Sequence, residues 1–175
     1  EHVMGILNRL FSRSPDPREE LRPLWHRVVA ISREPQFYEQ LGVTDTVEGR
    51  FDMITMVLSL VLLRLEAEPA HQQEVSLLTE LFVQDMDGQL REQGVGDVVV
   101  GKHVGKLMST LGGRWGALRD AFDGREDAAL VEALQRNVHF SDDSRAEGLA
   151  GELRHLHAQL HSLRADHILA GSIPR

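Results

Sequence analysis

Residues 81–107, LFVQDMDGQLREQGVGDVVVGKHVGKL, predict the central feature of the fold, which is a pair of helices joined by a short turn. Apolar residues recur at three- and four-residue steps in the first half of this stretch, as they do on one face of a helix. Gly94 and Gly96 then supply the left-handed backbone conformation that commonly ends a helix, and Asp97 suits the N-cap of the next one. We therefore expect a helical hairpin.

Apolar patterns with helical spacing also fill the chain on both sides of this hairpin, between Pro, Gly and Ser-Asp turn signals. They predict helices over residues 18–33, 36–41, 47–67, 71–93, 97–122, 126–138 and 146–169. Asp45 or Thr46 is the expected N-cap of the third of these helices, and Gly112-Gly113 is expected to interrupt or loosen the fifth.

No segment shows the polar–apolar alternation that is typical of a strand. The predicted fold class is therefore all-α, with a single compact domain of about six to seven helices around the central hairpin. We place this helical domain at residues 18–175. Residues 1–17 precede it as an N-terminal amphipathic segment and linker.

The composition limits the classes of function. The chain has 175 residues and a formal net charge of −8, so we expect no direct nucleic-acid binding, because phosphates would be repelled. It has no cysteine, which excludes disulfides, thiolate catalysis and cysteine-bound metals.

The uncharged run MITMVLSLVLL at residues 53–63 is much shorter than the roughly 20 residues that span a bilayer. It predicts a buried core helix.

The segment at residues 5–12, GILNRLFS, has an apolar and a cationic side if it is helical. Its apolar residues are Ile6, Leu7, Leu10 and Phe11. One interpretation is a short helix that binds a membrane surface or a partner. The other is a mobile terminus or a segment packed on the core, and the short length favours it, because fewer than three turns bind a membrane weakly.

Two motifs contain the residue types of a functional signature but lack the structural context that the function requires. Residues 96–103, GDVVVGKH, match the phosphate-binding pattern G-x-x-x-x-G-K, but His103 replaces the magnesium-binding Ser or Thr and a helix precedes instead of a strand. Asp85 and Asp87 lie two apart and point to different helix faces, so they form no carboxylate pair by themselves. We expect one of them to pair with a cation or to cap a neighbouring helix.

The C-terminal helix offers the best candidates for a metal site, which are His155, His157 and His161. The same helix carries a leucine stripe at three- and four-residue steps, made of Leu149, Leu153, Leu156, Leu160 and Leu163. This stripe favours core packing over metal binding. Two alternative functions therefore stay open: a helical metal-binding protein or enzyme that uses these histidines, and an adaptor that forms a homodimer through the stripe.

Three stretches of the chain carry a family resemblance. The first is PQFYEQLGVTDTVEGRFD at residues 35–52, the second is DMDGQLREQGVGDVVVGK at residues 85–102, and the third is Gly113-Arg114. In order and spacing they resemble the ubiquinol–cytochrome c chaperone family of alphaproteobacteria and mitochondria. The chain departs from the family pattern at Met56-Val57, where a Leu-His pair is common, and at Leu111-Gly112, where aromatic residues are usual.

The resemblance implies an assembly factor that is not an enzyme and needs no cofactor. Family members of the mitochondrial branch hold newly made cytochrome b for ubiquinol–cytochrome c reductase, respiratory complex III, and work there with a small partner and at the ribosome. The expected partner is cytochrome b or another complex III subunit. We further expect a cytoplasmic protein that associates with the inner membrane surface and contacts the ribosome.

The polar residues of these stretches form our hypothesis for the client- or partner-binding surface. They are Asp87, Arg91, Glu92, Asp97, Lys102 and Arg114. In the alternative, Asp97 only caps a helix, and Arg91 and Asp87 only hold neighbouring helices together. The apolar residues of the N-terminal segment would keep the protein at the bilayer, where a membrane client emerges.

Overall fold

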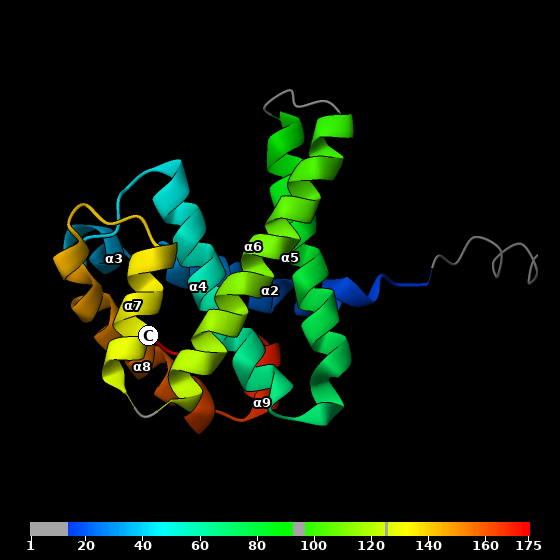
Figure 1. Ribbon diagram of the computed structural model, residues 1–175. Coiled ribbons are helices and arrows are strands. Elements are labelled where there is room, and N and C mark those ends of the chain that lie inside the picture. Colours follow the sequence, from blue (N-terminus) through cyan, green and yellow to red (C-terminus); the bar gives the residue numbers. More distant parts are fainter. Residues whose placement is uncertain (1–13, 93–96, 125) are drawn as a thin grey trace, which may run out of the picture.

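The structure is a computed structural model that describes residues 14–92, 97–124 and 126–175, without the side chains of residues 90 and 97–102. Figure 1 shows helices throughout this part of the chain. They are η1 (Pro17–Leu21), α2 (Arg22–Ser32), α3 (Pro35–Glu39), α4 (Val47–Glu66), η2 (Pro69–His71), α5 (Gln72–Glu92), α6 (Asp97–Asp123), α7 (Asp127–Asn137), η3 (Asp143–Arg145), α8 (Ala146–Ser162) and α9 (Ala165–Leu169). The all-α prediction is confirmed.

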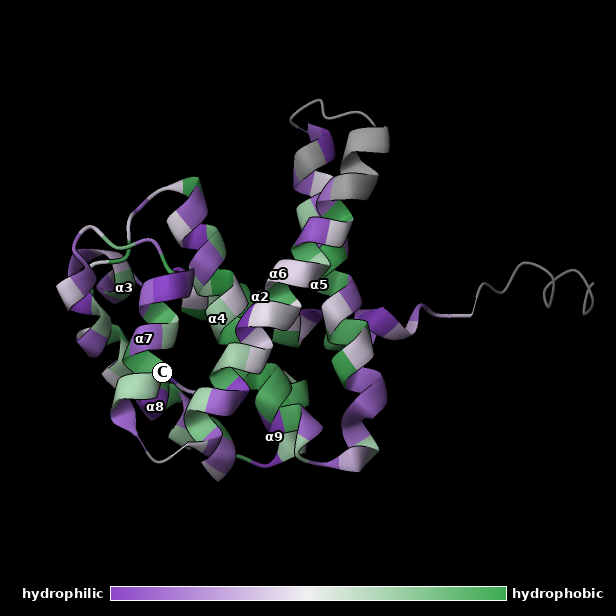
Figure 2. Ribbon diagram, viewed as in Figure 1, coloured by the Kyte–Doolittle hydropathy of each residue, from purple (hydrophilic) through white to green (hydrophobic). Residues whose placement is uncertain are grey.

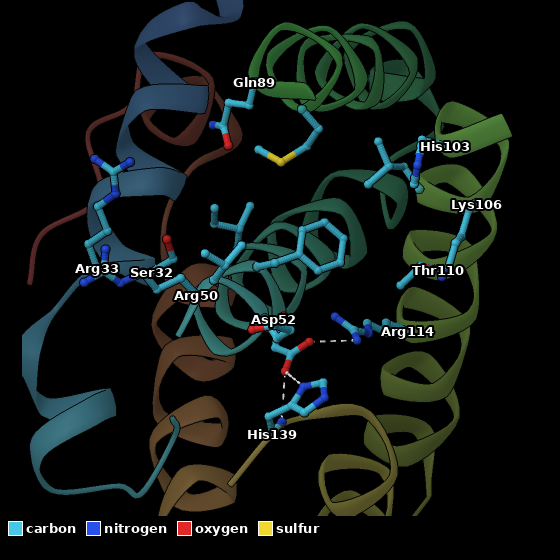
Figure 3. A pocket seen from close by; sticks show the side chains of 16 residues that line it. Ser32, Arg33, Arg50, Asp52, Gln89, His103, Lys106, Thr110, Arg114 and His139 are labelled. Carbon is cyan, nitrogen blue, oxygen red and sulfur yellow. Dashed lines mark hydrogen bonds and ion pairs between the residues drawn. The ribbon is translucent and has the colours of Figure 1, made fainter. Parts of the chain in front are cut away.

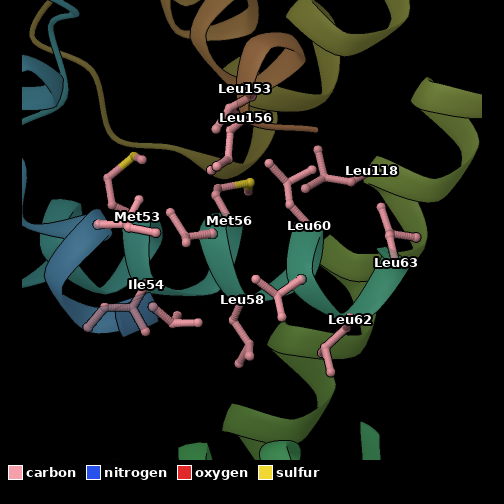
Figure 4. Packing of buried hydrophobic residues seen from close by; sticks show 14 of the residues in the cluster. Met53, Ile54, Met56, Leu58, Leu60, Leu62, Leu63, Leu118, Leu153 and Leu156 are labelled. Atoms are coloured by element: carbon pink, nitrogen blue, oxygen red, sulfur yellow. The ribbon is translucent and has the colours of Figure 1, made fainter. Parts of the chain in front are cut away.

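Helix α4 forms the centre of one compact domain. It packs against α2, α5, α6 and α8, and almost all of it is buried from Asp52 to Leu65. Figure 4 shows Met53, Met56 and Leu60 pointing toward Leu153 and Leu156 of α8, while Leu58 and Leu62 point to the opposite side. A helix that is apolar on all sides must be covered on all sides, which explains why the uncharged run lies in the core.

Figure 2 shows that the first turns of α4 mix hydrophilic and hydrophobic residues and lie away from the middle of the molecule, whereas the later turns are mostly hydrophobic and lie inside it. Thr46 is the N-cap, and its hydroxyl accepts a hydrogen bond from the Gly49 amide at 3.1 Å. The predicted choice between Asp45 and Thr46 is thus decided for Thr46. Among the described helices, none is both long enough and apolar enough to cross a membrane.

Helices α5 and α6 form the predicted hairpin, and its end projects from the body of the domain (Figure 1). The glycines of the turn and the side chain of Asp97 lie outside the described residues, so their capping roles stay predictions.

Helix α6 runs without a break through Gly112 and Gly113, contrary to our expectation. Packing of Leu111, Leu118 and Ala121 in the core outweighs the cost of about 1 kcal/mol for each glycine in a helix.

The predicted last helix is divided in two. Helix α8 ends at Ser162, Leu163 and Arg164 are extended, and α9 follows. The cause is the buried guanidinium of Arg64, which donates to the carbonyls of Leu160 at 3.1 Å and Leu163 at 3.0 Å. A cation that binds the last carbonyls of a helix stabilises its end there.

The leucine stripe of the C-terminal helix faces the inside of the domain. Leu149, Leu153 and Leu160 are fully buried within the single chain, and Leu156 nearly so. The homodimer through this stripe is therefore wrong, because the stripe already packs against the core of its own chain.

Candidate functional site

A cleft of about 600 Å³ opens between the first half of α4 and the hairpin of α5 and α6. Figure 3 shows Ser32 and Arg33 from the end of α2 on one side of it, and His103, Lys106 and Thr110 of α6 on the other. Helix α4 lies between these two sides. The loop that follows α7 adds one more lining residue.

The lining includes apolar side chains from three helices. They are Val47, Phe51, Ile54, Met86 and Leu107. Val47 is 77% exposed. Apolar side chains gathered in a hollow of the surface are typical of a site that binds another molecule.

An ionic cluster around the buried Asp52 lies in the cleft, and the His139 side chain of this cluster is 62% exposed. Asp52 is 1% exposed and pairs with Arg114 at 2.8 Å and with the ring Nδ1 of His139 at 2.7 Å. The backbone amide of His139 also donates to Asp52, at 2.8 Å, and Arg114 donates to the hydroxyl of Thr55 at 2.7 Å. The guanidinium lies 5.5 Å from the centre of the Phe51 ring. The charge of Arg114 compensates a carboxylate that could not stay charged alone in the interior. The hydrogen bonds from His139 reach only Oδ2, and Oδ1 contacts Arg114 as an ion pair without a hydrogen bond.

The loop between α3 and α4 brings His139 to this cluster. Val43 and Phe140 form an isolated antiparallel bridge, and the Thr44 amide donates to the carbonyl of His139 at 3.0 Å. The turn into α4 is so tight that a Cβ on Gly49 would lie 1.9 Å from the carbonyl oxygen of Thr44. Only glycine fits at this close approach.

The charges of the cleft are mainly positive. Arg50 is bound to Asp45 at 2.7 Å, a hydrogen bond that raises the pKa of the arginine, and Arg114 is bound to the buried aspartate. Arg33 and Lys106 are exposed and form no ion pair with any described residue. In a chain with a net charge of −8, these two cations favour an anionic ligand.

The predicted binding residues do not gather in one place. Arg114 lies in the cleft, whereas Asp87 belongs to a separate hollow of about 440 Å³, the outer groove, where Val83, Val104 and Met108 are also exposed or partly exposed. Glu92 lines a third hollow beside Arg22. The side chains of Asp97 and Lys102, and all of Ile6, Leu7, Leu10 and Phe11, lie outside the described residues.

The two aspartates of α5 face apart, as the spacing predicts. Asp87 accepts a hydrogen bond from Arg91, one turn later, at 3.1 Å, which confirms the expected pairing of one of them with a cation. Asp85 accepts one from the indole N–H of Trp25 at 3.2 Å. Each carboxylate therefore has a structural partner.

Of the three C-terminal histidines, His157 packs against an aromatic ring. The ring of His157 stacks on Phe122, with centroids 4.0 Å apart, and lies 4.2 Å from the ring of His161. Loss of hydration, and then the charge of His161, lowers the pKa of His157. His155 is exposed on another side. In the described part of the chain, no three His, Asp or Glu side chains lie close enough to hold a metal ion.

Sequence reasoning assigned no binding role to Arg33, Val47, Lys106 or His139. Arg50, Phe51 and Asp52 stood in a quoted stretch, but their spacing alone indicated no partner. The aspartate is 87 residues from His139 and 62 from Arg114 (114 − 52), and only the folded chain brings the three together.

Comparisons with known proteins agree with this architecture. Residues 39–174 match the protein family described as Ubiquinol-cytochrome C chaperone. The crystal structure of the Cbp3 homolog from Brucella abortus is similar to this chain, with a TM-score of 0.79 and 29% identity over 98% of this chain and 94% of that one. No curated protein matches the sequence. The matched residues include most of the cleft and its whole ionic cluster.

Proposed function

The chain belongs to the ubiquinol-cytochrome C chaperone family, and from this premise we propose that it is an assembly factor for ubiquinol–cytochrome c reductase, respiratory complex III. Its client in this proposal is newly made cytochrome b or another subunit of that complex. The family match and the similarity to the Cbp3 homolog along almost the whole chain support the assembly role. No catalytic step and no cofactor belong to the proposal.

We choose the cleft beside the hairpin as the binding site because it is lined by apolar side chains. A membrane subunit exposes apolar segments before assembly, and a chaperone must cover them reversibly. Exposed Val47 and the neighbouring ring of Phe51 supply such a surface at the opening of the cleft. The ion pair of Asp52 and Arg114 links α4 to α6 beneath this surface.

Contacts with the membrane surface, through Ile6, Leu7, Leu10 and Phe11, and with the ribosome stay predictions. So does a contribution of Asp87, Arg91, Glu92, Asp97 and Lys102 at the end of the hairpin.

A pull-down from alphaproteobacterial membranes tests the proposal, with this protein as bait and mass spectrometry of the bound proteins. We expect cytochrome b to be enriched over other abundant membrane proteins. Val47→Asp should reduce its recovery about tenfold, because the exposed valine would be replaced by a hydrated charge. Met108→Asp is the matched control, since Met108 is also an exposed apolar residue, 42% exposed, but lies in the outer groove.

Three results would contradict parts of this proposal. If no complex III subunit is enriched with the wild-type protein, the assembly role is wrong. If Val47→Asp binds the client as well as the wild type does, the cleft is not the client site. If Met108→Asp alone abolishes binding, the outer groove is the site instead.

A further inference from the structure

Arg33 and Lys106, which form no ion pair with any described residue, lie on opposite sides of the apolar surface of the cleft. Figure 3 shows Arg33 next to α2 and Lys106 on α6, with α4 between them. Phe51 and Ile54 of α4 lie in this middle region, and Val47 continues it toward solvent. The cleft is therefore an apolar strip with a positive charge on each side.

The other charged side chains of the cleft either form an ion pair within the protein or lie at one end of the cleft. Arg50 is bound to Asp45, and Arg114 to the buried Asp52. Glu48 lines the cleft from the first turn of α4, next to Val47. The charge offered to a ligand across the width of the cleft thus comes from Arg33 and Lys106, neither of which has an ion-pair partner among the described residues.

We infer that the cleft recognises an amphipathic helix of the client whose apolar stripe is flanked on both sides by acidic side chains. This inference rests on the proposed chaperone function and names the chemistry of its client segment. An apolar stripe covers the side chains of α4, and carboxylates on either side reach Arg33 and Lys106. Oppositely charged rims add specificity and speed association, while the apolar contact supplies most of the affinity.

The test uses the full chain and two fluorescent helical peptides with the same apolar stripe, one flanked by Glu and the other by Lys. Fluorescence anisotropy measures the dissociation constant of each. We expect the Glu-flanked peptide to bind at least tenfold more tightly at low salt, and the difference to shrink at about 0.5 M salt, where charges are screened. Equal binding of both peptides, or tighter binding of the Lys-flanked one, overturns the inference.

Charge reversal tests whether Arg33 and Lys106 are the cations that bind the acidic side chains of the peptide. The double variant Arg33→Glu plus Lys106→Glu should invert the preference, so that the Lys-flanked peptide binds more tightly. Both residues are exposed, so the fold tolerates the change. Arg136→Glu plus Arg164→Glu is the matched control, with the same change of charge at exposed positions away from the cleft, and it should leave the preference unaltered.

Vesicles of anionic phospholipid are the competing probe. If vesicles bind the wild type through Arg33 and Lys106 while the Glu-flanked peptide does not bind, these cations contact a lipid surface and the inference is wrong. The pull-down keeps this failure distinct from failure of the proposed function. Capture of cytochrome b together with no peptide preference removes only the acidic-helix inference, whereas no capture removes the chaperone role itself.

Discussion

The cleft and the outer groove are each lined by both α5 and α6, and they differ in the charge of their lining and in the ion pairs that support them. The cleft has a volume of about 600 Å³, two cations with no ion-pair partner among the described residues, and the ion pair of Asp52 with Arg114. The outer groove has about 440 Å³ and carries the acids Glu80 and Asp87, and the cation that lines it, Arg18, is bound to Asp16. Both expose a large apolar residue, Val47 in one and Met108 in the other. Apolar exposure alone therefore does not distinguish the two, whereas the charges of the lining and the ion pair of Asp52 with Arg114 do.

The largest expected difference between the two hollows is in their ionic pairs. Asp52→Ala leaves Arg114, whose side chain is 11% exposed, without its partner and should lower the free energy of unfolding by about 3–5 kcal/mol. Asp87→Ala in the outer groove should cost less than about 1 kcal/mol, because its pair with Arg91 is partly exposed. Urea denaturation measures both. Equal losses of unfolding free energy would show that the pair of Asp52 and Arg114 stabilises the fold no more than the pair of Asp87 and Arg91 does.

Glycine substitutions compare the loop that supports the cleft with the projecting hairpin. Gly49→Ala should destabilise the protein by about 1–3 kcal/mol, because the new Cβ would overlap the Thr44 carbonyl and force the turn to move. Gly105→Ala in α6 should stabilise it by up to about 1 kcal/mol, since a Cβ there meets nothing within 4 Å. Thermal denaturation of the two variants gives the comparison. A tolerated Gly49→Ala would mean that the loop adjusts without cost.

The smallest expected effect concerns the end of the hairpin. Arg91→Ala plus Lys102→Ala should weaken client binding only about two- to fivefold, because charges at the rim of an interface change association more than affinity. The pull-down of cytochrome b, quantified against the wild type, measures it. A loss as large as that of Val47→Asp would move the main contact from the cleft to the hairpin end. Unchanged binding with an intact fold would leave these two residues a purely structural role.

Local sequence patterns predicted the helices well where the signal is contained within a few turns. The uncharged run of α4, the hydroxyl of Thr46 at its start and the glycine that follows α3 all act over short distances in the chain. Gly42 has a φ of +78°, the conformation expected of a residue that ends a short helix.

The same reasoning failed where a distant residue decides the outcome. The end of α8 depends on Arg64, which lies 96 residues before Leu160, and its pattern gave no sign of a break. Gly112 and Gly113 were expected to interrupt α6, because their low helix propensity was considered without the core packing of the rest of this helix. The histidines stayed open as candidate metal ligands, beside the favoured core packing, because spacing cannot show that Phe122 stacks on one of them.

The sequence by itself determined the all-α class, the central hairpin, the buried α4 and the family, because each depends on residues close together in the chain. Only the tertiary structure decided that Phe51, Asp52, Arg114 and His139 meet in one cleft, and that Arg33 and Lys106 lie on its two sides. The physical reason is that a helix forms from local hydrogen bonds and a periodic apolar face, whereas a binding site is a set of long-range contacts. Those contacts exist only after the core has placed α2, α4 and α6 beside one another.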